Sequence, residues 1–229
     1  MLNYRAPSVL GVFLAAATLA ACNPEISADI YAGDIIEVAE SGTPLTFPVR
    51  LSMPIQNVKN CEKDKNKMLP TLNKYGKKTT FLSCTKLSGE MHDLMHVEME
   101  AEVIKGTVNG PDLPSGMFGL IIRHDVSGKA DIHFIKTTAA DNAVKEIDAN
   151  YPMQSVSLDG ISVKIRFNND LRTNSTFMVS GSFVDGNPID EETSFDLKRR
   201  DVIEVIPSNV RSRSLIKNGS AKFGSLLMQ

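Results

Sequence analysis

Hydrophobic and polar residues alternate with a period of two along several stretches of the chain, which is the pattern of strands with one buried face. The clearest case is 95–103, where five apolar residues alternate with His96 and three glutamates. The stretch 43–55 alternates in the same way but carries Pro48 and Pro54 at polar positions. Because proline cannot donate a hydrogen bond to a sheet ladder, these two residues predict a sheet edge or unpaired strand ends.

Further strands are predicted from the same pattern, and they lie at 79–87, 117–124, 130–136, 155–168, 176–184 and 193–197. The turn 125–129 predicts a hairpin, and the last three strands read as a meander. Helical patterns lie at 32–41, closed by Gly42, at 57–75, interrupted near Pro70, and at 139–150, capped by Thr137 or Thr138. The chain is therefore expected to be α+β, with a mainly antiparallel sheet and two or three short helices.

We expect a single domain over 26–207, with two β-α-β halves meeting near the Gly- and Pro-rich loop 106–116 as an alternative. The polar and basic segment 208–229 is predicted to be a loosely held tail. With 229 residues, of which 42% are hydrophobic and 23% charged, the chain has the composition of an ordinary globular protein. A net charge of −2, a pI near 6.1 and the absence of Trp argue against nucleic acid as a partner.

The N-terminus has the features of a secretory signal. Arg5 precedes a mostly apolar run over 9–21, which has the length of a signal h-region and is too short to span a membrane. The run ends in Leu19-Ala20-Ala21-Cys22, which resembles the lipobox of bacterial lipoproteins. This resemblance implies a signal peptide over 1–21, cleavage between Ala21 and Cys22, and a lipidated tether over 22–25. It also implies a diacylglycerol on the Cys22 thiol and an N-acyl chain, and no other cofactor is expected.

The lipobox resemblance also predicts where the protein resides. Two or three acyl chains anchor a protein stably, so the membrane itself is an expected partner. In lipoproteins of enterobacterial type, Asp directly after the lipidated Cys favours retention in the inner membrane, and here that residue is Asn23. The expected location is thus the bacterial envelope, on the periplasm-facing side of the outer membrane. No other stretch reaches 18 apolar residues, so no transmembrane helix is expected.

Lipidation of Cys22 would leave an even pair, Cys61 and Cys84, in a chain that the N-terminal signal predicts to be exported to an oxidising compartment. We therefore predict a Cys61–Cys84 disulfide that joins the helix of 57–75 to the strand of 79–87. A redox or metal role for this pair is disfavoured, because the spacing is not C-x-x-C and no convincing His cluster accompanies it.

The weak candidates for a metal site are His92, His96 and Glu98, which would share one face of a strand. A polar strand face turned to water is the simpler interpretation, so we expect neither a metal nor a catalytic residue. The cations of 59–78 and 198–222 could attract lipid or lipopolysaccharide phosphate near a membrane. A solvated helix and tail are the preferred interpretation of these basic stretches.

Beyond the lipobox, the region 26–103 resembles uncharacterised lipoproteins of enterobacterial genomes, prophages and plasmids, a group that brings no known activity. The resemblance rests on the strand, helix and alternating strand of 26–54 and on the two-cysteine region that follows. The expected function is a non-enzymatic interaction module that binds an envelope protein or lipid. A carrier of lipid or of a hydrophobic small molecule is the first alternative. An envelope hydrolase using His92, His96 and Glu98 is the second.

Overall fold

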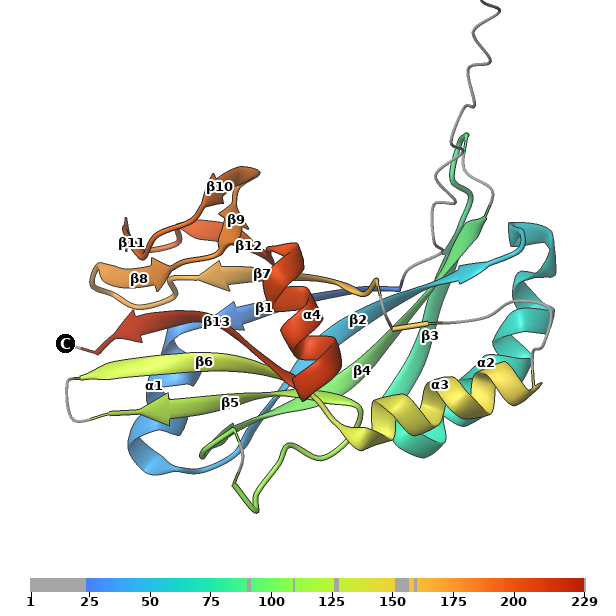
Figure 1. Ribbon diagram of the computed structural model, residues 1–229, viewed down its shortest axis with the longest axis horizontal. Coiled ribbons are helices and arrows are strands. Elements are labelled where there is room, and N and C mark those ends of the chain that lie inside the picture. The colour runs from blue at the N-terminus through green and yellow to red at the C-terminus, as the bar shows by residue number, and fades with distance from the viewer. Residues whose placement is uncertain are drawn as a thin grey trace, which may run out of the picture.

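The computed structural model describes residues 24–89, 92–108, 110–125, 128–150, 157–158 and 160–228. One thirteen-stranded sheet runs through these residues in the order β10-β9-β12-β7-β1-β2-β4-β5-β6-β13-β8-β11, with β3 paired to β4 beside this path. The strands are β1 (Glu25–Tyr31), β2 (Leu45–Ile55), β3 (Lys77–Thr85), β4 (Asp93–Lys105), β5 (Phe118–His124), β6 (Lys129–Lys136), β7 (Ser162–Asn168), β8 (Ser175–Val179), β9 (Ser182–Val184), β10 (Asn187–Ile189), β11 (Thr193–Leu197), β12 (Val202–Pro207) and β13 (Ser220–Leu227). The sheet curls, so that the two ends of this order come near each other (Figure 1). We call these ends the two branches of the sheet: β10-β9-β12 and β13-β8-β11.

Four α-helices occur in the described ranges: α1 (Ala32–Ser41), α2 (Cys61–Tyr75), α3 (Thr138–Asn150) and α4 (Asn209–Asn218), with a short 3₁₀ turn η1 (Val58–Asn60) before α2. The α+β class and the mainly antiparallel sheet are confirmed, with parallel pairing at β1–β7 and β4–β5. Gly42 ends α1 in the left-handed conformation, as predicted. The predicted interruption at Pro70 is wrong, because α2 continues through it. Pro70 and Asn66, four residues earlier, are both exposed, so water can reach the carbonyl that loses its donor.

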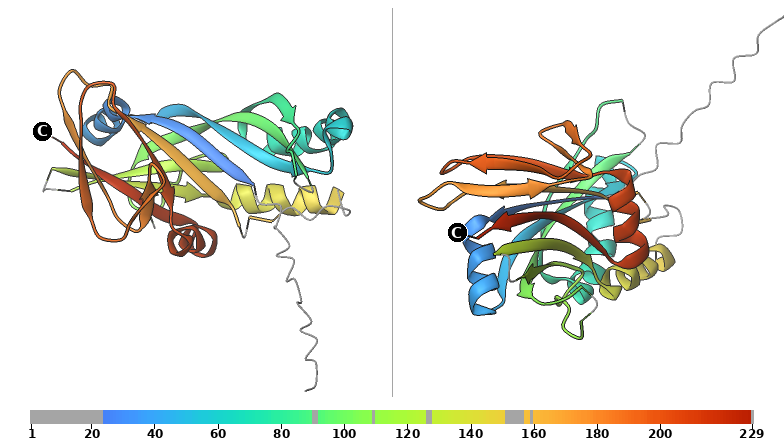
Figure 2. Two further views of the ribbon diagram at one scale, coloured as in Figure 1. Left: turned by 90° about the horizontal axis from the view of Figure 1, so that it is seen from above. Right: turned by 60° about the vertical axis from the view of Figure 1, so that its left-hand side comes forward.

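Helices α2 and α3 pack against each other at one end of the sheet, whereas α1 and α4 cover other parts of it (Figure 2). The α2–α3 contact is held by Glu146, whose carboxylate accepts hydrogen bonds from Thr71, Lys74 and Tyr75. A single large core cluster contains residues from before and after the loop 106–116. The chain on both sides of that loop therefore contributes to one hydrophobic interior.

A bent segment joins the two branches of the sheet. Strand β8 pairs with β13, and β9 pairs with β12, although only Ser180 and Gly181 separate β8 from β9. Gly181 has a positive φ of 54°, and an added Cβ would lie 2.8 Å from the Nε of Arg211 on α4. The prediction of one strand over 176–184 within a meander is therefore wrong. The two halves of this segment pair with strands that are distant in the sheet order.

Strand β2 lies inside the sheet, between β1 and β4, so the predicted edge position is wrong. Its pairing with β1 covers only Val49 to Ser52. Pro48 and Pro54 fall just outside this stretch, one at each end. Their missing N–H groups thus remove no bond of the β1–β2 ladder. The prediction of unpaired ends holds only on the side of β1, because β2 pairs with β4 along its whole length, from Leu45 to Ile55.

The expected loose tail over 208–229 is also wrong for the residues that the structure describes there. Residues 209–218 form α4, and β13 lies within the sheet between β6 and β8. Gly224 weakens the strand pattern in the sequence, but it is needed because a Cβ there would lie 2.5 Å from the ring of Phe177. Two cations of this segment bond within the fold: Lys222 to Asp131, and Arg211 to Ser180.

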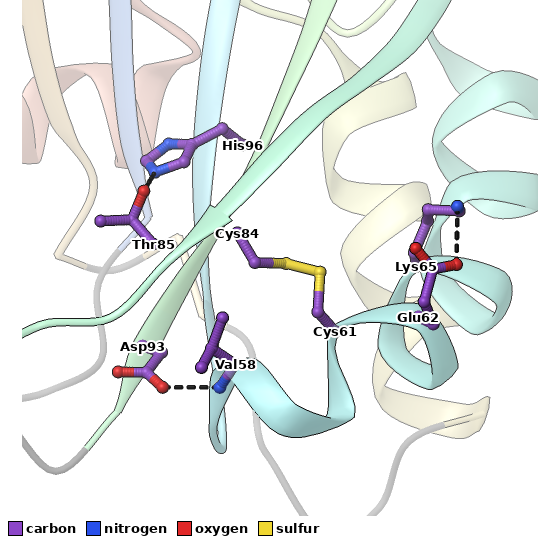
Figure 3. The surroundings of a disulfide bond; sticks show 8 residues. All are labelled: Val58, Cys61, Glu62, Lys65, Cys84, Thr85, Asp93 and His96. Carbon is purple, nitrogen blue, oxygen red and sulfur yellow. Dashed lines mark hydrogen bonds and ion pairs between the residues drawn. A yellow bond between two sulfur atoms is a disulfide. The ribbon is translucent and has the colours of Figure 1, made fainter.

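The predicted disulfide is present and joins Cys61, at the start of α2, to Cys84 on β3, with 6.2 Å between the Cα atoms (Figure 3). The carboxylate of Asp93 supports the same corner of the molecule. It accepts hydrogen bonds from the backbone N–H of Val58, at 2.6 Å, and of Leu87, at 3.0 Å. The start of α2 is thus fixed to the β3–β4 hairpin both covalently and by hydrogen bonds.

Replacing both cysteines, Cys61→Ala with Cys84→Ala, is expected to lower the free energy of unfolding by about 3 kcal/mol, because a bridge between residues 23 apart restricts the unfolded chain. Urea unfolding of the oxidised protein, the reduced protein and the double variant measures this difference. The reduced protein should match the variant. An unchanged midpoint in both would show that the bridge contributes no stability.

Candidate functional site

A polar cleft of about 320 Å³ lies on the outward face of β7, β1, β2 and β4. Pairing of these strands aligns their outward side chains in rows across the sheet. Ser27 lies opposite Lys164 on one side and Arg50 on the other, and Arg50 in turn lies opposite Glu98. Six charged side chains line the cleft, three acidic and three basic: Glu25, Asp29, Glu98, Arg50, Lys164 and Arg166.

Some of these charges are paired and others are available. Arg166 lies 3.4 Å from Asp29, and Lys164 lies 4.0 Å from Glu204 on β12. Arg50 and Glu98 are direct neighbours across β2 and β4, yet no ion pair or hydrogen bond within the described ranges engages either charged group. The cleft thus presents a guanidinium with several donors and a carboxylate acceptor that a polar ligand can reach.

A second depression, of about 310 Å³, continues the cleft over β3 and β4. The two hollows share Pro48 and Glu98 in their lining. The outer part carries an ion pair between Lys78 and Glu100, at 2.7 Å. Together they form a polar groove across five neighbouring strands, which suits an extended ligand better than a compact one.

His96 precedes Glu98 by two residues on β4 and is paired with Ser52 of β2, so it lies in the row next to Arg50 and Glu98. Its Nδ1 is 2.8 Å from the hydroxyl of Ser52. Its Nε2 is 3.0 Å from the hydroxyl of Thr85 (Figure 3). Burial and the nearby Arg50 lower the pKa of His96, while Glu25 raises it less. The ring is therefore neutral at physiological pH and acts as a link between two hydroxyl groups.

The predicted metal candidates are only partly brought together. His96 and Glu98 share the outward face of β4, whereas His92 precedes the strand. Among the residues that the structure describes, no group of three or more His, Cys, Asp or Glu side chains could hold a metal ion. Both ring nitrogens of His96 already contact hydroxyl groups, so its donor atoms are not free for a metal.

The Ser52–His96 contact has the spacing of a nucleophile and its base, but its surroundings do not suit acyl transfer. Ser52 is only 6% exposed, so a substrate carbonyl cannot reach its hydroxyl easily. The second nitrogen of the ring faces Thr85, whereas a catalytic histidine is oriented by a carboxylate at that position. The contacts of His96 therefore link β2, β3 and β4.

An apolar pocket lies between the sheet and helices α2 and α3, lined by side chains that include Leu51, Leu72, Phe118 and Ile147. Its volume is about 10 Å³. This is roughly the space that one water molecule needs, and an acyl chain needs many times more. The packed interior at this point therefore has no room for a lipid tail.

A second cluster of charges surrounds Asp131 on β6. Burial would raise the pKa of Asp131, but hydrogen bonds from Lys222, Ser225 and Arg123 outweigh it and lower the pKa to about 2. All three partners point at one carboxylate. Because the cluster satisfies itself, it holds β5, β6 and β13 together and is not a candidate binding site.

Sequence patterns missed most of the cleft. Alternation placed Glu98 on the polar face of its strand, but nothing in the sequence indicated that Arg50, Lys164 and Arg166 would lie beside it. The neighbouring strands β1 and β7 are more than 130 residues apart in the chain. Ala21, Cys22 and Asn23, on which lipidation and sorting depend, lie outside the described residues. Within the part of the chain that the structure covers, no helix is both long and apolar enough to span a bilayer.

The sequence model of a protein family described as a domain of unknown function (DUF7424) matches residues 24–229. The chain belongs to this family. The matched region includes every element of the fold, from β1 to β13, and all residues of the polar cleft. No curated protein and no solved structure matches the chain.

The lowered pKa of His96 predicts a pH dependence of stability. A histidine whose pKa is lower in the folded state than in the unfolded state destabilises the fold as pH falls through its unfolded value of about 6.5. The variant His96→Asn should therefore lose less stability than wild type between pH 7.5 and pH 5. Part of the slope remains, because burial also lowers the pKa of His133.

Urea unfolding at a series of pH values measures these slopes. The control is His124→Asn, at the exposed end of β5, which should follow wild type. Equal slopes for His96→Asn and wild type would contradict the assignment.

Proposed function

We propose that this chain is a lipid-anchored protein of the bacterial envelope that binds a partner protein through the polar cleft, without catalysing a reaction. The observation that carries the proposal is the pair Arg50 and Glu98. Two opposite charges face each other across neighbouring strands and do not pair, in an open cleft lined by charges of both signs. A polar, extended segment of a protein supplies the matching donors and acceptors.

The position of the cleft relative to the lipobox supports the proposal. Cys22 lies three residues before Glu25, the first residue of β1 and part of the cleft lining. Three residues span at most about 11 Å. The chain is already fixed at Pro24, whose carbonyl accepts a hydrogen bond from the N–H of Ser162. A lipid on Cys22 would thus hold the cleft close to the membrane surface. Asn23 favours the periplasm-facing side of the outer membrane.

The two alternatives have less support. A carrier of lipid or of a hydrophobic small molecule needs an apolar cavity, and the apolar pocket beside α2 and α3 holds about 10 Å³. A hydrolase built on His96 needs an accessible nucleophile and an oriented base, whereas Ser52 is buried and Thr85 faces the second ring nitrogen.

The anchor is tested by fractionating cells that produce the wild-type chain. We expect the protein in the membrane fraction, with an intact mass that equals residues 22–229 plus a diacylglycerol and one acyl chain. The variant Cys22→Ala should lose both the lipid mass and the membrane association. The variant Cys84→Ala, which keeps Cys22, is the control and should remain with the membrane. An unlipidated wild-type protein would refute the anchor.

The cleft is tested by crosslinking in intact cells, capture of the tagged chain and quantification of the proteins that come with it. Loss of a hydrogen bond to a charged group costs about 1.5–3 kcal/mol. Arg50→Ala and Glu98→Ala should therefore each reduce the captured partner about tenfold or more. Arg213→Ala, on the exposed side of α4, is the matched control. A partner whose recovery is unaffected by both cleft variants would place binding elsewhere on the surface.

A further inference from the structure

Three exposed lysines gather at the corner where the disulfide joins helix to sheet. Lys59 lies in η1, Lys63 in the first turn of α2, and Lys86 directly after β3. Each is two residues from a bridged cysteine, and the bridge holds the two Cα atoms 6.2 Å apart. Two residues of chain span at most about 7 Å, so the three Cα atoms lie within about 20 Å of one another. We call Lys59, Lys63 and Lys86 the basic corner.

The described carboxylates near the basic corner are already engaged or buried. Asp93 accepts two backbone N–H groups, and Glu62 pairs with Lys65 at 2.8 Å. Asp64 is fully buried in the first turns of α2. No hydrogen bond or ion pair within the described ranges engages the ammonium groups of the basic corner. Their positive charge is therefore available to an anion outside the protein.

The basic corner lies at the end of the molecule from which the anchor would leave. Glu25, at the start of β1, pairs with Ser52 near the end of β2, and Ser52 pairs with His96 near the start of β4. The end of β3 continues this end of the sheet (Figure 1). Cys22 lies only two residues before Pro24, where the described chain begins. The start of β1, which follows the predicted anchor in the chain, and the basic corner thus lie at the same end of the sheet.

We propose that the basic corner binds the anionic head groups of the bilayer in which the lipid of Cys22 is embedded. This inference rests on the proposed function for the position of the anchor. A lysine near an anionic surface gains about 1 kcal/mol, which corresponds to about a fivefold change in occupancy. Three lysines acting together favour the docked orientation on the order of 100-fold at low salt. The corner would then fix how the molecule stands on the membrane, in addition to the lipid on Cys22.

The experiment uses residues 22–229, in which Cys22 is the one thiol outside the disulfide, coupled through that thiol to a maleimide lipid in vesicles. The rate at which each lysine is acetylated is measured by mass spectrometry. Vesicles that mix phosphatidylglycerol with phosphatidylcholine should slow labelling of the basic corner at least fivefold relative to pure phosphatidylcholine. High salt should remove the difference, since it screens the charges. Lys198, in the turn at the opposite end of the sheet, should label equally in both.

Matched variants complete the test. The double variant Lys63→Gln, Lys86→Gln should restore rapid labelling of Lys59. The double variant Lys198→Gln, Arg199→Gln, at the far end of the sheet, should leave Lys59 protected. Equal labelling in the two kinds of vesicle, or equal protection of Lys198, would overturn the proposal. Chemical coupling replaces the cellular modification, so a failure of Cys22 lipidation in cells would leave this result standing.

Discussion

The pairing of one bent segment, 175–184, with both branches of the curled sheet is the constraint on which the fold depends. An open sheet with a hydrophobic inner face would leave that face, and two strand edges, unprotected. The segment covers the edges of β13 and β12 by pairing first with one and then with the other, and the short strands β11 and β10 become the outer strands. Inside, Phe167 of β7 stacks on Phe177 of β8 with 4.1 Å between the ring centroids, so the closure is also packed. The bend at Gly181 and the contact with Arg211 make the two pairings compatible.

The curled sheet determines which of its faces is accessible. Its inner face is filled by the core, and the apolar pocket beside α2 and α3 is too small for a lipid tail. The outer face is polar, and strand pairing aligns its side chains in rows. One row runs across four strands from Lys164 through Ser27 and Arg50 to Glu98, and the adjacent row links Ser52 to His96. In the first row Arg50 and Glu98 form no ion pair within the described part of the chain, whereas the second row forms bonds within the protein. This contrast is why Arg50, and not His96, is central to the proposed function.

Local patterns predicted single elements well and their arrangement poorly. The alternation over 95–103 became β4, and Gly42 closed α1 as expected. The misplaced elements are those whose stability comes from neighbours distant in the chain. Strand β13 lacks a strong pattern because Gly224 is needed for close approach to Phe177, yet the strand is held on both sides. Its Lys222, expected in a solvated tail, bonds to a carboxylate 91 residues away.

The sequence by itself determined the features that depend on local chemistry: the strand and helix periods, the candidate lipobox that ends at Cys22, and the partnership of Cys61 with Cys84. The last could be predicted because only one cysteine pair remains once the lipobox cysteine is set aside. The tertiary structure alone decided the strand order, the closure of the sheet, the polar cleft and the basic corner. Each of these depends on register between strands that are far apart in the chain, and a period of two specifies which face a residue occupies but not which strand lies beside it.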